Sequence, residues 1–239
     1  MRFLVLQHHA AEHPGVFRDY LAADGIGWDA VQLQDDESLP SLDGYDAVWV
    51  MGGPMDVWQE DIYPWLRPEK ALIEEAVFAR GLPFLGCCLG HQLLGEIAGG
   101  VCGAMTTPEV GVYAVELTDA ARNDTLLAGC EPRFEALQWH GAAVTEVPGN
   151  VEVLAQSPAC AIQAIRVGER AWGLQYHIEA TATTVGEWGA VPAYAKALEQ
   201  ALGPDALPGL DAAVAERLPT FNAAAHRLYR NFMAAVPQR

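Results

Sequence analysis

Short apolar segments alternate with helix-like segments in the N-terminal part of the chain. The apolar segments are rich in β-branched and aromatic residues and stop at turn residues, which predicts buried strands at residues 3–7, 28–32, 45–51 and 82–87. The segments between them predict helices at residues 16–23, 64–80 and 91–98. Alternating strands and helices are typical of a parallel sheet that is covered on both faces.

The pattern changes after residue 110. Short strands separated by turns are predicted at residues 112–117, 134–139, 151–155, 161–167 and 171–176, which suits an antiparallel extension of the same sheet. From about residue 190 the chain is alanine-rich and helical, with expected interruptions at Gly203-Pro204, Pro208-Gly209 and Pro219. The predicted fold is therefore α/β: an open, mostly parallel, doubly wound (flavodoxin-like) sheet with an antiparallel extension and a helical C-terminus. We see no repeat or linker, so residues 1–239 are expected to form one domain with a helical extension at 190–239.

The amino-acid composition excludes several classes of binding partner and location. The chain has 14 Lys and Arg against 31 Asp and Glu, a net charge of −17, which argues against nucleic acid or anionic lipid as a partner. No apolar run approaches the ~20 residues of a membrane span, and the start lacks the apolar stretch of a signal peptide. The five cysteines are odd in number and without CxxC spacing, which favours a reducing cytoplasm over disulfides or a metal site.

The richest chemistry lies at a compressed strand-turn-helix around Cys88. Gly86 and Gly90 stand two residues before and two after Cys88, which is the spacing of a nucleophile elbow with cysteine in place of serine. Glycines are needed there because the neighbours at those positions pass too close for a Cβ. Cys87 has leucines at both positions instead. We therefore predict Cys88 as the nucleophile and Cys87 as a core residue.

The helix that follows adds to this chemistry. Its N-terminus favours a thiolate, and its free backbone N–H groups can bind an oxyanion, with the amide of Leu89 as the first donor. A second donor is expected from the glycine loop Gly52-Gly53-Pro54, which follows the strand predicted at 45–51.

A base for this thiol is predicted at the end of the strand near residue 176. His177 and Glu179 are two residues apart, so in a strand they point to the same side. The carboxylate can then hold the imidazole in one tautomer while the other ring nitrogen faces a thiol, the arrangement that cysteine hydrolases require. The elbow lies 89 residues upstream of His177.

With these motifs in order, the chain resembles the class I glutamine amidotransferases, and within them the stand-alone, GMP-synthase-like members. The resemblance covers about residues 1–185. It rests on three segments, which are Gly52-Gly53-Pro54, the elbow at 86–92 and the segment at 173–179. Supporting segments are 63–66, 108–111 and 137–141.

The resemblance implies a triad of Cys88, His177 and Glu179, and an oxyanion hole from the amides of Gly53 and Leu89. It further implies that Gln92 holds the α-substituents of glutamine and that Trp139, His140 and Gly141 line the pocket, largely through their backbone. The implied reaction is attack on a γ-carboxamide, release of ammonia and hydrolysis of a γ-glutamyl thioester, with no cofactor or metal.

The sequence departs from the family pattern at three positions. Ile178 stands where proline is usual, Ala142 replaces an acid after His-Gly, and Cys87 replaces a branched aliphatic residue. The first bears on the His177–Glu179 turn and the second on a polar contact in the pocket. None of them removes a member of the implied triad.

Other polar residues are given simpler interpretations. His8, His9 and His13 have no second ligand cluster and are expected to be exposed or at the pocket rim rather than metal ligands. Glu12 follows the first strand, where ligands of open α/β sheets bind, but we interpret it as an ordinary loop acid. His140 has no orienting group nearby in the sequence and is interpreted as pocket wall.

Three functions remain open at this point. The first is a glutamine amidotransferase that feeds ammonia to a separate synthetase chain. The second is a hydrolase of γ-glutamyl peptides or amides that acts alone, and the third is a catalytically silent regulatory subunit.

Overall fold

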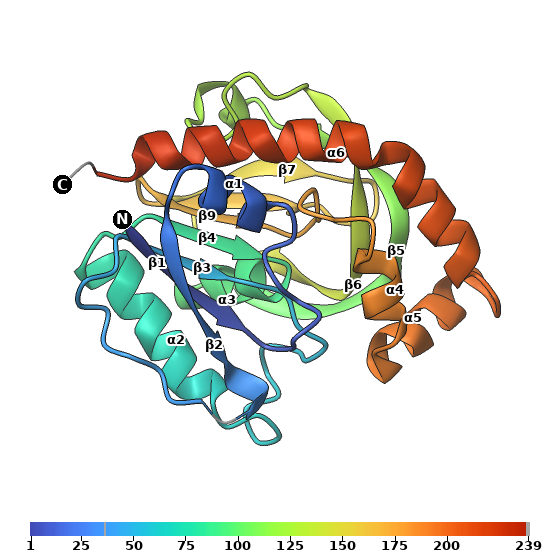
Figure 1. The fold of residues 1–239 in the computed structure, drawn as a ribbon, viewed down its shortest axis with the longest axis horizontal. Helices are drawn as coiled ribbons and strands as arrows, with labels where there is room; N and C mark the ends of the chain where they lie inside the picture. Colours follow the sequence, from blue (N-terminus) through green and yellow to red (C-terminus); the bar gives the residue numbers. More distant parts are fainter. Residues whose placement is uncertain (36, 238–239) are drawn as a thin grey trace.

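A nine-stranded sheet runs through the protein. The computed structural model describes residues 1–35 and 37–237, and within them the strand order is β2-β1-β3-β4-β9-β8-β7-β5-β6 (Figure 1). The first five in this order pair in parallel: β2 (Gly27–Gln32), β1 (Arg2–Gln7), β3 (Ala47–Val50), β4 (Phe84–Cys87) and β9 (Ala171–Leu174). The others pair antiparallel: β8 (Ala164–Val167), β7 (Val151–Gln156), β5 (Val101–Leu117) and β6 (Arg133–Glu146). The predicted fold class, including the antiparallel extension, is confirmed.

Helices cover both faces of the parallel strands, and the alternation along β1 shows why. Phe3 and Val5 pack into one cluster with α1 (Phe17–Ala23) and the long α6 (Leu207–Ala235). Leu4 and Leu6 pack into a second cluster with α2 (Leu66–Glu74) and α3 (Leu89–Ile97) on the other face. Successive strand residues point to opposite faces, so a strand that is apolar throughout requires cover on both.

A third apolar cluster joins the C-terminal helices to the curled antiparallel strands. It contains Leu137 and Trp139 of β6 together with residues of α4 (Thr184–Gly189), α5 (Pro192–Leu202) and the start of α6. In Figure 1 these helices lie beside β5 and β6, at one end of the sheet. The helical C-terminus thus packs against the same end of the sheet as β6, where Trp139 and His140 lie.

Two of the interruptions expected in the C-terminal segment are wrong. A single helix α6 spans Leu207–Ala235 and contains both Pro208 and Pro219. Pro208 lies in the first turn, where a backbone N–H has no helical partner to lose. Pro219 has no N–H to donate to the Ala215 carbonyl four residues earlier. Both residues are exposed, so water can hydrogen-bond to that carbonyl instead. The break at 203–204 is real, because Gly203 has φ 90° and caps α5.

Other predicted elements differ mainly in their ends. The helix expected at 64–80 is α2 followed by a π-helical turn at Glu75–Ala79. Strands β5 and β6 are much longer than expected. The pairing of β5 is irregular between Ala104 and Glu109, so the first part of this strand lacks the regular alternation from which a strand is predicted. Helix α4 was not predicted.

All five cysteines are unpaired. Among the described residues, no helix is both long and apolar enough to cross a bilayer, and no group of three His, Cys, Asp or Glu side chains is placed to hold a metal ion.

Candidate active site

Cys88 lies in a strained turn between β4 and α3. Its φ of 51° and ψ of −103° are rare for a residue with a side chain, and it directly precedes α3. A Cβ at Gly86 would lie 2.3 Å from the carbonyl oxygen of Gly90, and one at Gly90 would lie 2.1 Å from that of Val50. The steric reason for the two glycines, inferred from their spacing, is therefore present in the structure.

The close approach at Gly90 gives a prediction about stability. Gly90→Ala is expected to lower the free energy of unfolding by ~1–3 kcal/mol, because backbone rather than a flexible side chain must move. Gly186→Ala is the matched control, since it lies in α4 with nothing within 4 Å of its added Cβ, and it should be neutral or stabilising by ~0.5–1 kcal/mol. Urea denaturation of both variants measures the difference; equal stabilities would contradict the tight turn.

The backbone around Cys88 leaves donors free at the start of α3. The amide of Cys88 donates to the Leu174 carbonyl at 2.8 Å, and its carbonyl accepts the amide of Gln92 at 3.1 Å. The first-turn amides, beginning with Leu89, have no acceptor within the helix. Cys88 is 6% exposed, and its sulfur accepts a hydrogen bond from the Gln175 side-chain amide at 3.5 Å.

His177 and Glu179 form a buried pair next to this thiol. The His177 Nδ1 lies 2.6 Å from the Glu179 Oε1, and backbone hydrogen bonds in both directions tie His177 to Leu137 of β6. Burial lowers the pKa of His177, but the charge of Glu179 and the interaction with Cys88 outweigh it, so the pKa lies well above the usual value. The Trp188 ring packs edge-on against the imidazole, with centroids 4.6 Å apart. The structure thus brings Cys88, His177 and Glu179 together.

The glycine loop after β3 approaches Cys88 from the other side. A Cβ at Gly53 would lie 2.8 Å from the His8 Cβ and 2.9 Å from the Leu89 Cδ2, so a residue without a side chain is required between them. The His8 imidazole fixes this loop, since Nδ1 donates to the Gly52 carbonyl at 2.8 Å and Nε2 is hydrogen-bonded to Glu69 Oε1 at 2.8 Å.

The expectation for His8 is wrong, because its ring is fully buried rather than exposed or at a rim. Both ring nitrogens lie within hydrogen-bond distance of an oxygen. Burial lowers the pKa of His8, and the charge and hydrogen bond of Glu69 raise it above the usual value overall. Glu69 comes from α2, so no local sequence pattern points to this partner.

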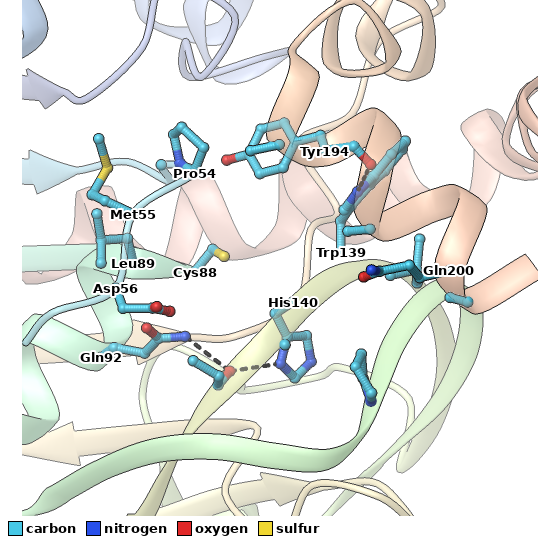
Figure 2. A pocket seen from close by; sticks show the side chains of 18 of the residues that line it. Pro54, Met55, Asp56, Cys88, Leu89, Gln92, Trp139, His140, Tyr194 and Gln200 are labelled. Carbon is cyan, nitrogen blue, oxygen red and sulfur yellow. Dashed lines mark hydrogen bonds between the residues drawn. The ribbon is translucent and has the colours of Figure 1, made fainter. Parts of the chain in front are cut away.

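Cys88 opens into a cavity of about 540 Å³. In Figure 2 its sulfur points into the space between the loop that carries Pro54 and Met55 and the wall formed by Tyr194 and Trp139. The cavity wall contains every predicted oxyanion-hole and pocket residue: Gly53, Leu89, Gln92, Trp139, His140 and Gly141.

The side chain of Gln92 is held in place by two acceptors. Its Nε2 donates to the Ala142 carbonyl and to the Gln175 Oε1, both at 3.0 Å. Ala142, the position where the sequence lacks the usual acid, therefore supplies a polar contact through its backbone, which also accepts from His140 Nδ1 at 2.9 Å (Figure 2).

His140 has a charged neighbour that sequence reasoning missed. Glu109 of β5 is paired with His140 of β6 in the sheet register, and its Oε2 lies 3.2 Å from the His140 Nε2. Glu109 is 3% exposed and accepts hydrogen bonds from Ser157 and Gln163. Glu109 is distant from His140 in the sequence, so the neighbouring residues could not reveal it, and His140 lines the cavity as expected.

Glu12 is a buried acid rather than an ordinary loop residue. It is 3% exposed and accepts a hydrogen bond from the Tyr194 hydroxyl. Its carboxylate fills the space next to Gly52, because a Cβ added at Gly52 would lie 2.4 Å from the Glu12 Oε2. Burial raises the pKa of Glu12, which the charge of His177 and the Tyr194 hydrogen bond oppose. Its place at the carboxyl end of β1 was the available signal; Tyr194 on α5 was not foreseeable.

A raised pKa at Glu12 has a consequence for stability. The folded protein holds this proton more tightly than the unfolded chain, so stability falls as pH rises from the ordinary glutamate pKa to the folded one. Glu12→Gln removes this penalty and is expected to raise the free energy of unfolding at pH 7 and flatten its slope with pH. Denaturation at several pH values tests this, with the exposed Glu74→Gln as control. An unchanged slope would contradict it.

The family profile of Glutamine amidotransferase class-I matches residues 17–188. The chain belongs to the class I glutamine amidotransferase family. Its relatives in this family include one subunit of a glutamine-hydrolyzing GMP synthase from Sulfolobus acidocaldarius, which is 31% identical over 162 residues, 67% of this chain and 81% of that protein. Another is the putative glutamine amidotransferase-like protein YfeJ of Salmonella typhimurium, 32% identical over 194 residues, 77% of this chain and 78% of that one.

A longer relative and a solved structure also resemble this chain. The chain aligns with only 27% of a glutamine-hydrolyzing GMP synthase from Aeropyrum pernix, at 36% identity over 150 residues, 63% of this chain. A glutamine amidotransferase from Thermotoga maritima superimposes with a TM-score of 0.86 at 27% identity, covering 97% of both chains. This class I amidotransferase therefore shares its fold with that protein over nearly its full length, α5 and α6 included.

Proposed function

We propose that this class I amidotransferase hydrolyses the γ-carboxamide of glutamine and releases ammonia to a separate acceptor enzyme. One arrangement carries the proposal: a thiol in a strained turn, next to a buried imidazole that a carboxylate holds, at the edge of a 540 Å³ cavity. Nucleophile, base and orienting group in this order are what covalent acyl transfer needs.

The reaction would proceed in two halves. His177 takes the Cys88 thiol proton as the sulfur attacks the side-chain carbonyl carbon of glutamine, and the oxygen takes up the negative charge beside the amides of Gly53 and Leu89. His177 gives its proton to the leaving nitrogen, the carbon–nitrogen bond breaks and ammonia departs, leaving a γ-glutamyl thioester. Water then attacks the thioester, His177 accepts its proton and returns it to sulfur, and glutamate leaves.

Residues of the cavity wall are proposed to orient glutamine. Gln92 is fixed by the Ala142 carbonyl and Gln175, so it presents a defined side of its amide to the cavity. Trp139, His140 and Gly141 lie across from it on β6. We propose that these four residues hold the α-amino and α-carboxylate groups.

The separate acceptor is suggested by the relatives. The relative from Sulfolobus acidocaldarius is named as one subunit of a GMP synthase, and this chain matches 81% of its length but only 27% of the longer GMP synthase. We therefore propose that a second chain receives the ammonia. The five unpaired thiols suit work in the reducing cytoplasm.

The size of the cavity favours a second candidate, a stand-alone γ-glutamyl amide or peptide hydrolase. A volume of about 540 Å³ lies in the range of pockets for drug-sized ligands, roughly 300–1,000 Å³, and leaves room beyond a single amino acid. The same thiol chemistry would release an amine instead of ammonia.

A glutamine-analogue diazoketone tests the shared chemistry. We expect one covalent adduct, located on Cys88 by mass spectrometry and absent from Cys88→Ala. Labelling of another cysteine, or no labelling, would contradict the proposal and favour a catalytically silent protein. Rates with glutamine and with γ-glutamyl peptides then separate the two candidates: inert peptides exclude the stand-alone hydrolase, and peptides preferred over glutamine exclude the ammonia donor.

A further inference from the structure

The wall of the cavity at Cys88 holds a carboxylate that the proposed reaction does not use. Asp56 lies three residues after Gly53 in the loop that follows β3, and its side chain points into the cavity (Figure 2). We propose that Asp56 binds the α-ammonium group of the substrate. This assignment rests on the proposed function and narrows its substrate class to γ-glutamyl compounds whose α-amino group is free.

The residues on either side of Asp56 fix the direction of its side chain. Met55 is 6% exposed and Val57 is 1% exposed, and both pack into the apolar cluster that α2 covers. The Lys70 ammonium donates to the Val57 carbonyl at 2.9 Å, which ties the loop to α2. Because both neighbours are anchored in the core, the side chain between them is directed toward the cavity.

The turn that begins at Asp56 makes no use of its carboxylate. The Asp56 amide donates to the Gln59 Oε1 at 2.9 Å, and the Gln59 amide donates to the Asp56 backbone carbonyl at 3.0 Å. Aspartate in a turn commonly accepts a backbone N–H through its side chain. Here the turn is closed without that bond, so the carboxylate is left for another partner.

No described residue supplies that partner. Burial is the one influence on the pKa of Asp56, which it raises, and no hydrogen bond or opposite charge within the described residues opposes it. Asp56 is only partly buried, so its carboxylate can be reached from the cavity. A carboxylate that has lost water without gaining a counter-charge is costly, and a bound cation would remove this cost.

Gln92 offers a second acceptor from the same wall. Its Nε2 donates to the Ala142 carbonyl and to the Gln175 Oε1, so both of its N–H bonds are used. Only its Oε1 remains for a ligand, and in Figure 2 Gln92 and Asp56 both lie on the side of the cavity that faces His140. Two acceptors, one of them charged, select an ammonium group, which only donates, and repel the α-carboxylate.

The rest of the wall contains no competing carboxylate. Among the described residues that line the cavity, Asp56 is the only acidic one, and Ala142 stands where an acid is usual in the family. A zwitterionic amino acid that enters the cavity loses water from its ammonium group, which then needs a counter-charge. Asp56 is the residue that can provide it.

Substrate and side chain can be changed separately to test this pairing. The probe 4-carbamoylbutanoate is glutamine without its α-amino group. Asp56→Asn should lower kcat/KM for glutamine about ten- to hundredfold, the loss expected for a hydrogen bond to a charged group, and mainly through KM. It should not lower kcat/KM for 4-carbamoylbutanoate. If the preference for glutamine over this probe were the same in Asp56→Asn as in the unchanged protein, the proposal would be overturned.

Asp61→Asn is the matched control, since the Asp61 side chain is 96% exposed and lies outside the cavity wall. It removes the same charge from the same loop and should leave the preference for glutamine unchanged. An equal loss of this preference in both variants would mean that the overall charge of the loop acts on the substrate, which also contradicts direct binding by Asp56.

Equilibrium binding distinguishes a failure of this assignment from a failure of the proposed function. By titration calorimetry, Cys88→Ala should bind glutamine about ten- to hundredfold more tightly than the double variant Cys88→Ala with Asp56→Asn. Equal affinities would overturn the role of Asp56 alone. If glutamine bound to neither variant and the unchanged protein did not hydrolyse it, the proposed function would be wrong, and this assignment with it.

Discussion

Cys88→Ala is expected to reduce glutamine hydrolysis by roughly 10⁴-fold or more, the loss typical of removing a covalent nucleophile. The cavity and the His177–Glu179 pair remain in this variant, since Cys88 contributes little to the core beyond one buried sulfur. Glutamine should therefore still bind while turnover disappears. Steady-state ammonia release and equilibrium binding of glutamine separate the two effects.

The neighbouring cysteine provides a matched control. Cys87 is buried in the apolar cluster beneath α6, and its burial raises the pKa of its thiol well above the usual value. Cys87→Ala should lower stability by ~1–2 kcal/mol through lost packing and leave kcat within a few-fold of the unchanged protein. If Cys87→Ala abolished turnover and Cys88→Ala did not, the elbow would be misassigned.

The turn geometry at the elbow could be predicted from the sequence because its two glycines are close to Cys88 in the chain. Gly86 and Gly90 lie within two residues of Cys88, and the contacts that forbid a Cβ come from the same turn and from the adjacent strand β3. The pairing of His177 with Glu179 is equally local, since the two residues lie two positions apart just beyond the end of β9.

Partners from distant elements were missed for the opposite reason. His8 acquires Glu69 from α2, His140 acquires Glu109 from the facing strand, and Glu12 acquires Tyr194 from α5. Each pairing depends on sheet register or helix packing across 31 to 182 residues of sequence. A buried charge is recognisable only once its counter-charge is known, so an isolated acid or histidine in a loop suggests an exposed residue.

The length of α6 could not be predicted either, because the prediction relied on the local helix propensity of proline. Proline inside a helix usually ends it, which made Pro219 an expected break. Tertiary packing overrides this preference: Val214 and Phe221 are buried on either side of Pro219, and the exposed face can be solvated. The helix therefore continues through Pro219 to Ala235.

Glu179→Gln is expected to lower kcat by about 10²–10⁴-fold, because the amide keeps a similar shape but loses the charge that stabilises imidazolium at His177. That charge is the main contribution that raises the pKa of His177 against burial. Without it, His177 loses its proton at lower pH, so the alkaline limb of the kcat/KM profile should move to lower pH. The stabilisation that a raised histidine pKa gives below the unfolded pKa should disappear as well.

Glu187→Gln is the matched control, since Glu187 holds another histidine, His13, at 3.0 Å but lies outside the cavity wall. It should leave kcat and the pH profile unchanged. If Glu179→Gln instead kept kcat within threefold and its alkaline limb in place, another carboxylate would have to stabilise the imidazolium. Glu12 is the buried acid whose charge also acts on His177, so Glu12→Gln would then have to show the loss expected of Glu179. The orienting carboxylate is therefore the one, Glu179 or Glu12, whose replacement by glutamine shifts the pH profile of kcat/KM.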